Sequence, residues 1–365
     1  MIDIDKVLPL IVVTPPFPDE SFQGFFARTL SKTAARSRNL GLALATVAPR
    51  PRTKRTFFSV VELANLATLL NVDVALLTTM SLPDVSRKRH PLKRVRSFYG
   101  TRIPFSMVDL NVRRISPTAL GNSSFHRAMW TLKLFHLDGE TLELLMSRCP
   151  VCNQQLGWQR SVHPAACDTC VDNAGRSNVD LRDYPSGPYE MEDPDAYRYV
   201  YSLINPITEG QYESPQDFSG VSRAVCFEAI FAMVRWMLQE PITRSTLSSP
   251  KEGIYQKIGP EVVASAGRYF LGGFRGLRDF ETQFPGVSHI RSFGVIVSLN
   301  NYLGAGVKSL FEDVLRPSRA RLAPIGLRSV DWLYARSAMP KAAIEFSRPR
   351  NERQVERHAK SRERR

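Results

Sequence analysis

The sequence predicts a mainly α-helical protein that carries a small zinc-ribbon-like β module. Apolar residues recur at helical spacing in segments near both ends of the chain, which favours helical N-terminal and C-terminal domains. Between these segments stand two Cys-x-x-Cys pairs, a pattern typical of a metal-binding ribbon. The chain has 365 residues, 43% hydrophobic and 23% charged, so its composition is that of a globular protein rather than a disordered one.

Changes in composition along the chain predict five segments. Residues 177–216 are rich in Pro, Asp and Tyr, which is typical of a loop-rich linker, and the last residues are charged with almost no apolar side chains. The predicted segments are an N-terminal helical domain (1–118), a zinc-binding module (119–176), the linker (177–216), a C-terminal helical domain (217–347) and a basic tail (348–365). The tail suits either phosphate binding or solubility.

The N-terminal domain is expected to begin with a helix that buries one face. Apolar side chains between Phe22 and Leu30 recur at helical spacing. The adjacent acids Asp19 and Glu20 precede this stretch, and we expect them to meet the positive end of the helix dipole rather than to perform acid–base chemistry.

A helix-turn-helix-like hairpin is predicted next. Ser59 and Glu62 have the spacing of a capping box, and apolar residues follow at helical spacing up to Leu70. Asp73 is placed to cap a second, shorter helix that ends near Met80. Two such helices occur both in DNA-reading units and in ordinary helical hairpins, and both alternatives stay open.

The C-terminal domain is expected to contain two further helices. One covers the apolar stretch from Phe218 to Leu238, and the other begins at Pro260 and continues through Leu277. Cys226 lies among apolar neighbours in the first of them, so we interpret it as a core residue rather than a ligand.

The formal net charge of +14 makes nucleic acid the first partner to consider. Part of this charge is concentrated between residues 87 and 114, interleaved with aromatic residues that offer stacking faces. An acidic protein surface would satisfy the same charges. The candidate nucleic-acid-binding residues are Arg87, Lys88, Arg89, Lys93, Arg94, Arg96, Arg113 and Arg114.

The N-terminus lacks the basic start and apolar centre of a secretory signal, and no stretch approaches about eighteen consecutive apolar residues. We therefore expect a cytoplasmic protein without a membrane partner. In a reducing compartment, closely paired cysteines favour metal binding over disulfides.

The strongest chemical motif consists of two knuckles, Cys149 to Cys152 and Cys167 to Cys170, separated by residues 153–166. Such knuckles predict one structural Zn²⁺ held by Cys149, Cys152, Cys167 and Cys170. His163 lies in the intervening hairpin but is not needed as a ligand. A redox pair is disfavoured because no βαβ pattern surrounds the cysteines.

No catalytic constellation is recognisable. The sequence has no Gly-rich phosphate loop, no HExxH and no GxSxG motif. Four thiolates would fill every position of a tetrahedral zinc ion and leave none for water. We therefore predict a protein that is not an enzyme.

Three places in the chain carry short motifs: PFPDESF at residues 16–22 with Gly24 and Arg28 following, RRISP at 113–117 with HRAMW at 126–130, and CPVCNQQLGW at 149–158 closed by Cys167 and Cys170. Together these motifs resemble the TniQ family, which includes the TnsD-type target selectors of bacterial Tn7-like transposons. The resemblance covers roughly residues 9–176. It implies a bacterial, non-catalytic adaptor for DNA transposition that binds target DNA, directly or through a guide complex, and recruits an AAA+ transposition regulator.

One departure from the family concerns its first zinc finger. Family members commonly carry an additional CxxC and a Cys-x-x-His, whereas residues 116–142 here contain no cysteine. We expect His126 and His136 to be packing or surface residues. The alternative function is a scaffold that does not bind DNA and docks on a CRISPR effector or on the AAA+ transposition regulator, which is an ATPase. Whether the protein forms a homodimer also stays open.

Overall fold

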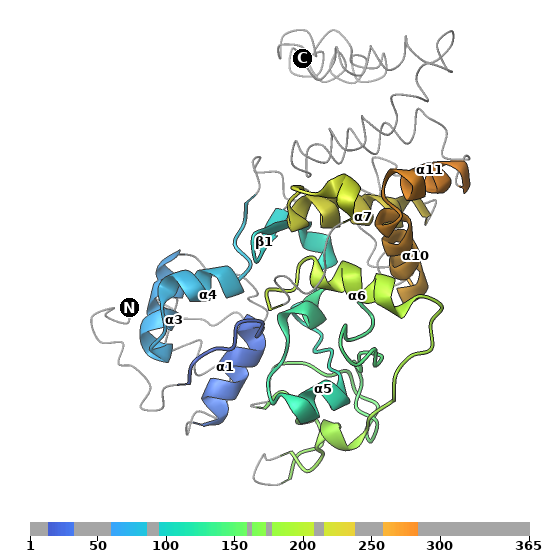
Figure 1. Cartoon of the computed structure of the whole chain (residues 1–365). Helices are drawn as coiled ribbons and strands as arrows, with labels where there is room; N and C mark the ends of the chain where they lie inside the picture. The colour runs from blue at the N-terminus through green and yellow to red at the C-terminus, as the bar shows by residue number, and fades with distance from the viewer. Residues whose placement is uncertain are drawn as a thin grey trace, which may run out of the picture.

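The computed structural model describes residues 14–32, 60–85, 95–158, 163–172, 177–207, 215–237 and 258–283. Over these residues the protein is helix-rich with one small sheet (Figure 1), which confirms the predicted predominance of helix. The α-helices are α1 (Phe22–Ser31), α3 (Val60–Leu70), α4 (Val74–Met80), α5 (Pro117–Asn122), α6 (Pro194–Ser202), α7 (Arg223–Met237), α10 (Pro260–Leu271) and α11 (Gly273–Gln283). The remaining elements are strands β1 (Val95–Phe98) and β2 (Thr101–Pro104) and the 3₁₀ turns η3 (Phe105–Met107), η4 (Ala128–Thr131), η5 (Leu181–Asp183) and η6 (Gln216–Phe218).

Helices α1, α3 and α4 form a three-helix unit with a core of its own. Phe25, Leu66 and Leu77, one from each helix, are fully buried within this core. The predicted helix boundaries hold: Ser21 caps α1 by accepting from the Gly24 N–H, and Asp73 caps α4 by accepting from the Ala75 N–H. The proposed cap at Ser59 lies outside the described residues.

The α3–α4 pair has the geometry expected of a helix-turn-helix. The two helices are bent by 116°, within the range of about 90–120° typical of that motif. Asn71 adopts a positive φ in the connecting turn. The outward face of α4, however, presents Val74, Leu76 and Thr79, and the helix contains no basic residue. In its described residues, α4 therefore lacks the side chains that most often contact phosphates or guanine.

The sheet lies outside the predicted zinc module. Strands β1 and β2 form an antiparallel hairpin whose turn, Tyr99-Gly100, has positive φ at both positions. The Tyr99 hydroxyl donates to the Glu20 carbonyl, so the hairpin tip contacts the loop before α1. Within the described part of the module itself, only isolated bridges such as Arg148 to Gln155 join the segments. The prediction placed the β structure incorrectly.

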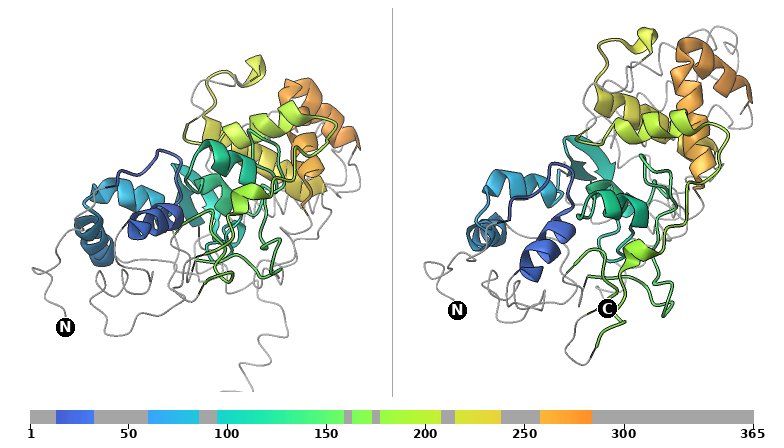
Figure 2. Two further views of the ribbon diagram at one scale, coloured as in Figure 1. Left: turned by 90° about the horizontal axis from the view of Figure 1, so that it is seen from below. Right: turned by 60° about the horizontal axis from the view of Figure 1, so that its bottom comes forward.

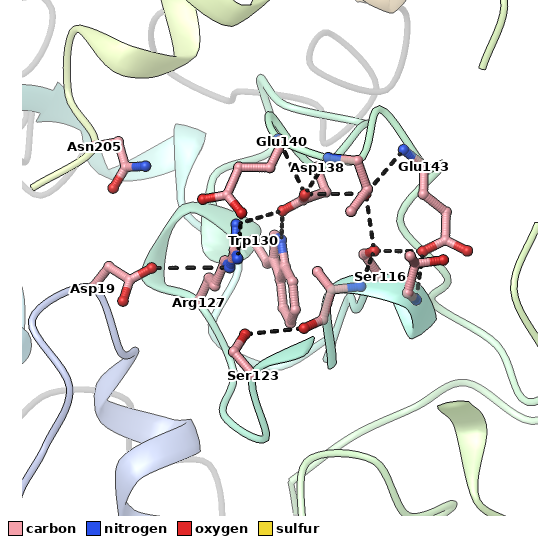
Figure 3. A network of polar contacts seen from close by, with 12 residues as sticks. Asp19, Ser116, Ser123, Arg127, Trp130, Asp138, Glu140, Glu143 and Asn205 are labelled. Carbon is pink, nitrogen blue, oxygen red and sulfur yellow. Dashed lines mark hydrogen bonds and ion pairs between the residues drawn. The ribbon is translucent and has the colours of Figure 1, made fainter. Parts of the chain in front are cut away.

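The region without cysteines, residues 116–142, folds around a buried tryptophan (Figure 3). Trp130 is fully buried, and its indole N–H donates to Asp138 at 2.9 Å. Asp138 also accepts from the backbone N–H groups of Glu140 and Thr141 and lies 3.4 Å from Arg127. Hydrogen bonds to this carboxylate therefore organise the segment.

The predicted linker contains a core helix. Helix α6 is capped by Asp193 and buries Tyr199 and Val200 against α10, where Tyr199 stacks on Phe270. Gly267 of α10 permits this contact because a Cβ there would lie 2.7 Å from both the Ala196 carbonyl oxygen and the Val200 side chain. A loop-rich linker is therefore the wrong description of residues 194–202, because the Pro, Asp and Tyr content of this stretch obscured an amphipathic helix.

The C-terminal helices share their core with the middle of the chain. Buried residues of α7 and α10 belong to the same cluster as Met107, Leu132 and Phe135. Figure 2 shows α6, α7 and α10 grouped together on the side of the molecule away from α1 and α3. In the described residues, part of the predicted module thus shares a core with the C-terminal helices, whereas the cysteine knuckles belong to a separate cluster that includes Trp130.

The helix predicted from Pro260 is interrupted after α10. Gly273 has φ +62°, a conformation that residues other than glycine rarely adopt, and the chain turns there into α11. As predicted, Cys226 is completely buried in α7. In the described ranges, no single helix is long and apolar enough to cross a membrane; the bent α3–α4 pair passes that test only when both helices are taken together.

Candidate metal centre

The four predicted cysteines converge on one point. Their Sγ atoms all lie within 4.8 Å of one another, and no other cluster of metal-ligating side chains is found in the described part of the chain. Cys149 and Cys170 are 3.9 Å apart, and Cys152 and Cys167 are 3.8 Å apart. In a regular tetrahedron of sulfurs at about 2.3 Å from a zinc ion, every edge is about 3.8 Å. The cluster can therefore hold one metal ion, and its dimensions fit zinc.

Each knuckle is shaped by a tight turn. After Cys149 the chain reverses, with the Asn153 N–H donating to the Cys149 carbonyl and Asn153 in a positive-φ conformation. In the second knuckle, the N–H groups of Thr169 and Cys170 both point at the Cys167 sulfur at 3.4 Å. Amide groups that face a sulfur stabilise its thiolate form, which is the form that binds metals.

Arg113 bonds to residues of the metal centre, so the prediction that it contacts nucleic acid is wrong. The side chain is 0% exposed and donates to the Ala166 carbonyl and, at 2.6 Å, to Asp168 beside Cys167. Burial lowers the pKa of Arg113, whereas Asp168 and the neighbouring Cys167 oppose that shift. An arginine enclosed in this way has no surface to present to a phosphate.

Two other predicted nucleic-acid residues are also turned inward. Arg96 is 5% exposed and pairs with Asp84 at 3.5 Å, so that prediction is wrong too. The Arg114 guanidinium donates to the Phe135 carbonyl, and burial lowers the pKa of Arg114 to about 10. Arg87, Lys88, Arg89, Lys93 and Arg94 lie outside the described residues and stay predictions.

Neither histidine near the cysteines belongs to the sulfur cluster. The Nδ1 of His163 lies 3.2 Å from the Ala165 N–H, as expected of a residue that is not a ligand. His126 is 1% exposed; its Nε2 lies 2.9 Å from the Arg114 carbonyl and its Nδ1 lies 2.7 Å from the Ser21 hydroxyl. Burial lowers the pKa of His126 to about 3, so the ring is neutral and donates from Nε2 to the carbonyl. The prediction of a packing role for His126 is confirmed.

The loop before α1 docks on the 126–128 segment through buried polar contacts. Glu20 is fully buried and holds Arg28 of α1 through two hydrogen bonds, at 2.6 and 2.8 Å. The Asp19 carbonyl accepts from the Ala128 N–H at 2.6 Å, and the Asp19 carboxylate lies 3.9 Å from Arg127 (Figure 3). The expectation that Asp19 and Glu20 would face the helix dipole is wrong, because Ser21 is the cap.

The Asp19 carboxylate predicts a pH dependence of stability. Both of its oxygens are buried without a hydrogen-bond partner in the described part of the chain, and burial raises its pKa to about 6, against the opposing effect of Arg127. The folded state therefore binds this proton more tightly than the unfolded chain, so ionised Asp19 destabilises the fold as the pH rises. From pH 5 to pH 8, the wild type should lose about 1 kcal/mol relative to Asp19→Asn, as measured by urea unfolding. Parallel stability curves for the two proteins would contradict this assignment.

Sequence reasoning missed several residues that build the site. Asp168 sits inside the second knuckle, and Trp158, which follows the first, lies under the Arg113 guanidinium at 5.5 Å. An acid between two cysteines and an arginine upstream were signals for such a pair, but the positive charge of the region favoured a nucleic-acid interpretation. No family model matches the chain, and no curated protein matches it.

Proposed function

We propose that this protein is a TniQ-like target-selection adaptor of a transposon. It binds target DNA, or a guide complex bound to DNA, and recruits the AAA+ transposition regulator. The observation that carries the proposal is the convergence of the motifs behind the resemblance. They are far apart in the sequence, but they contact one another in the fold.

The contacts among these motifs are specific. Ser21 of the first motif bonds to His126 of the second, and Asp19 receives a backbone hydrogen bond from Ala128. Arg113, of the RRISP stretch, bonds to Asp168 in the second cysteine knuckle. Motifs that resemble one family by chance would have no reason to form a continuous set of buried contacts, so this arrangement supports their common origin.

The chemistry of the metal centre supports a non-catalytic role. Zinc bound by four thiolates is saturated, and Cys149 and Cys167 are nearly fully buried, at 1% and 2% exposure. Bound there, the ion would join the two knuckles and contribute to folding free energy rather than activate water.

For DNA binding, the proposal depends on the predicted basic residues that lie outside the described part of the chain. We expect their replacement by alanine to reduce the salt dependence of DNA affinity, because each lost phosphate contact removes about 0.9 from the slope of log K against log salt. With five contacts the slope should fall by up to about 4.5, measured by fluorescence anisotropy on random duplex DNA across a salt series. The variant replaces Arg87, Lys88, Arg89, Lys93 and Arg94.

The matched control removes the same charge elsewhere. It replaces the exposed residues Lys32, Arg148, Arg182, Arg268 and Arg275 by alanine. If the basic segment contacts phosphates, only the first variant loses most of the salt dependence. Equal losses in both variants would indicate a general field of the +14 chain and would contradict a local DNA-binding segment.

One observation favours the scaffold as a second candidate. Arg96 and Arg113 are buried, and α4 presents Val74 and Leu76 rather than basic side chains to its surroundings. Such a surface suits a protein partner, for example the ATPase or a CRISPR effector subunit. Absence of DNA binding by the wild type at low salt, combined with measurable binding of the ATPase, would favour the scaffold over the direct target selector.

A further inference from the structure

Arg113 forms hydrogen bonds to both halves of the metal centre. Its backbone N–H donates to the Leu156 carbonyl, in the strand-like segment that leaves the first knuckle, at 3.0 Å. Its side chain reaches the second knuckle, where it donates to the Ala166 carbonyl at 2.5 Å and to Asp168 at 2.6 Å. Arg113 therefore connects two segments that also meet at the sulfur atoms and through the Gly157 N–H bond to Asp168.

The acceptors surround one of the ligands. Cys167 lies between Ala166 and Asp168, so the guanidinium is bonded on both sides of it, and a further bond runs to the His163 carbonyl at 3.1 Å. A guanidinium is planar and presents its N–H groups in a fixed fork, so three acceptors held by one fork are fixed relative to each other. The Asp168 carboxylate also accepts from the Gly157 N–H at 3.0 Å, which ties this acceptor to the first knuckle again.

We propose that Arg113 is a positioning residue for the metal: it aligns the Cys167–Cys170 knuckle with the Cys149–Cys152 knuckle so that the ion meets a prearranged set of four thiolates. This inference rests on the metal-binding part of the proposed function. Because folding already aligns the ligands, less conformational entropy is lost when the metal binds, and the affinity is higher. Mutation of residues that orient metal ligands in this way commonly lowers metal affinity by about 10- to 100-fold.

Arg113 acts on the metal centre through the geometry of its hydrogen bonds rather than through its charge. Its positive charge is paired directly with Asp168, whose side chain is 12% exposed, so the pair adds little net charge beside the thiolates. A lysine keeps the charge but donates from a single point, so it cannot hold the Ala166 carbonyl and the carboxylate in the same fixed relation. Arg113→Lys should therefore behave more like Arg113→Met than like the wild type.

The test is competition for Zn²⁺ between the full-length protein and a chromophoric chelator, with Arg113→Lys and Arg113→Met beside the wild type. We expect zinc affinity to fall about 10- to 100-fold in both variants. In a parallel measurement, Co²⁺ replaces Zn²⁺, and the visible bands of tetrahedral thiolate coordination should shift in Arg113→Lys, because the second knuckle is no longer held. This spectrum reports the geometry of the sulfur atoms and not the overall stability.

Arg127→Met is the matched control. Arg127 is also buried, at 6% exposure, and is held by carboxylates, but it belongs to the polar network around Trp130. It should lower stability without changing zinc affinity or the Co²⁺ spectrum. Wild-type zinc affinity in Arg113→Lys, or an equal loss in Arg127→Met, would overturn the positioning role while leaving the metal site intact. A wild-type protein that binds no zinc would overturn the metal site and this inference together.

Discussion

Replacement of Cys152 by serine should abolish retention of the metal and loosen the module around it. Cys152 supplies one of four sulfurs within 4.8 Å of one another, and a serine hydroxyl at that position is a poor ligand for zinc. Binding free energies of structural zinc are about 10–16 kcal/mol in small zinc-finger peptides, and much of that energy stabilises the fold. Zinc content after dialysis should therefore fall from one per chain to near zero, and the melting temperature should fall with it.

Cys226 provides the control for this prediction. It is a cysteine buried in α7 outside the cluster, so Cys226→Ala removes a thiol without removing a ligand. This variant should keep its zinc. Unchanged zinc content in Cys152→Ser would refute the four-cysteine site, whatever happened to stability.

Replacement of Asp138 by alanine should destabilise the protein by about 3–5 kcal/mol, because it breaks a buried ion pair and leaves several donors unsatisfied. Asp138 is fully buried and accepts from the Trp130 indole and from two backbone N–H groups. It also faces Arg127, whose side chain is only 7% exposed (Figure 3). Chemical unfolding monitored by Trp fluorescence gives the change in free energy directly.

Glu140 tests whether burial is the reason for this effect. Glu140 pairs with the same Arg127, at 2.7 Å, but its side chain is 55% exposed. Because exposed pairs are screened by water, Glu140→Ala should cost less than about 1 kcal/mol. Similar losses for both variants would show that the network does not depend on the buried carboxylate.

The local patterns predicted the N-terminal helices and the cysteine cluster. Both depend on short-range information: helical spacing of apolar residues between Phe22 and Leu30, the cap at Asp73, and the fixed geometry of Cys-x-x-Cys turns. Such features are decided within one or two turns of chain. Sequence alone is sufficient for them.

Whether a charged residue is buried or exposed could not be predicted from local patterns. Arg113 and Glu20 are buried because partners distant in the sequence, or across a helix, offer matching hydrogen bonds, and a count of charges contains no information about those partners. Helix α6 was missed for a related reason: its Tyr residues look polar in a window of Asp and Pro, yet Tyr197 and Tyr201 are packed in the core. The Tyr99-Gly100 turn was missed because tyrosine stands where such two-residue hairpin turns usually carry Asn, Asp or Gly.

The most direct test of the four-thiolate, non-catalytic centre on which the account rests is the coordination of the metal in the purified protein. Zinc quantification with X-ray absorption at the zinc edge should give one ion per chain with four sulfur neighbours at about 2.3 Å. That result is expected for a saturated, non-catalytic centre built from Cys149, Cys152, Cys167 and Cys170. Fewer than four sulfurs, with an oxygen or nitrogen neighbour in the remaining position, would contradict it and would point to an open site able to activate water.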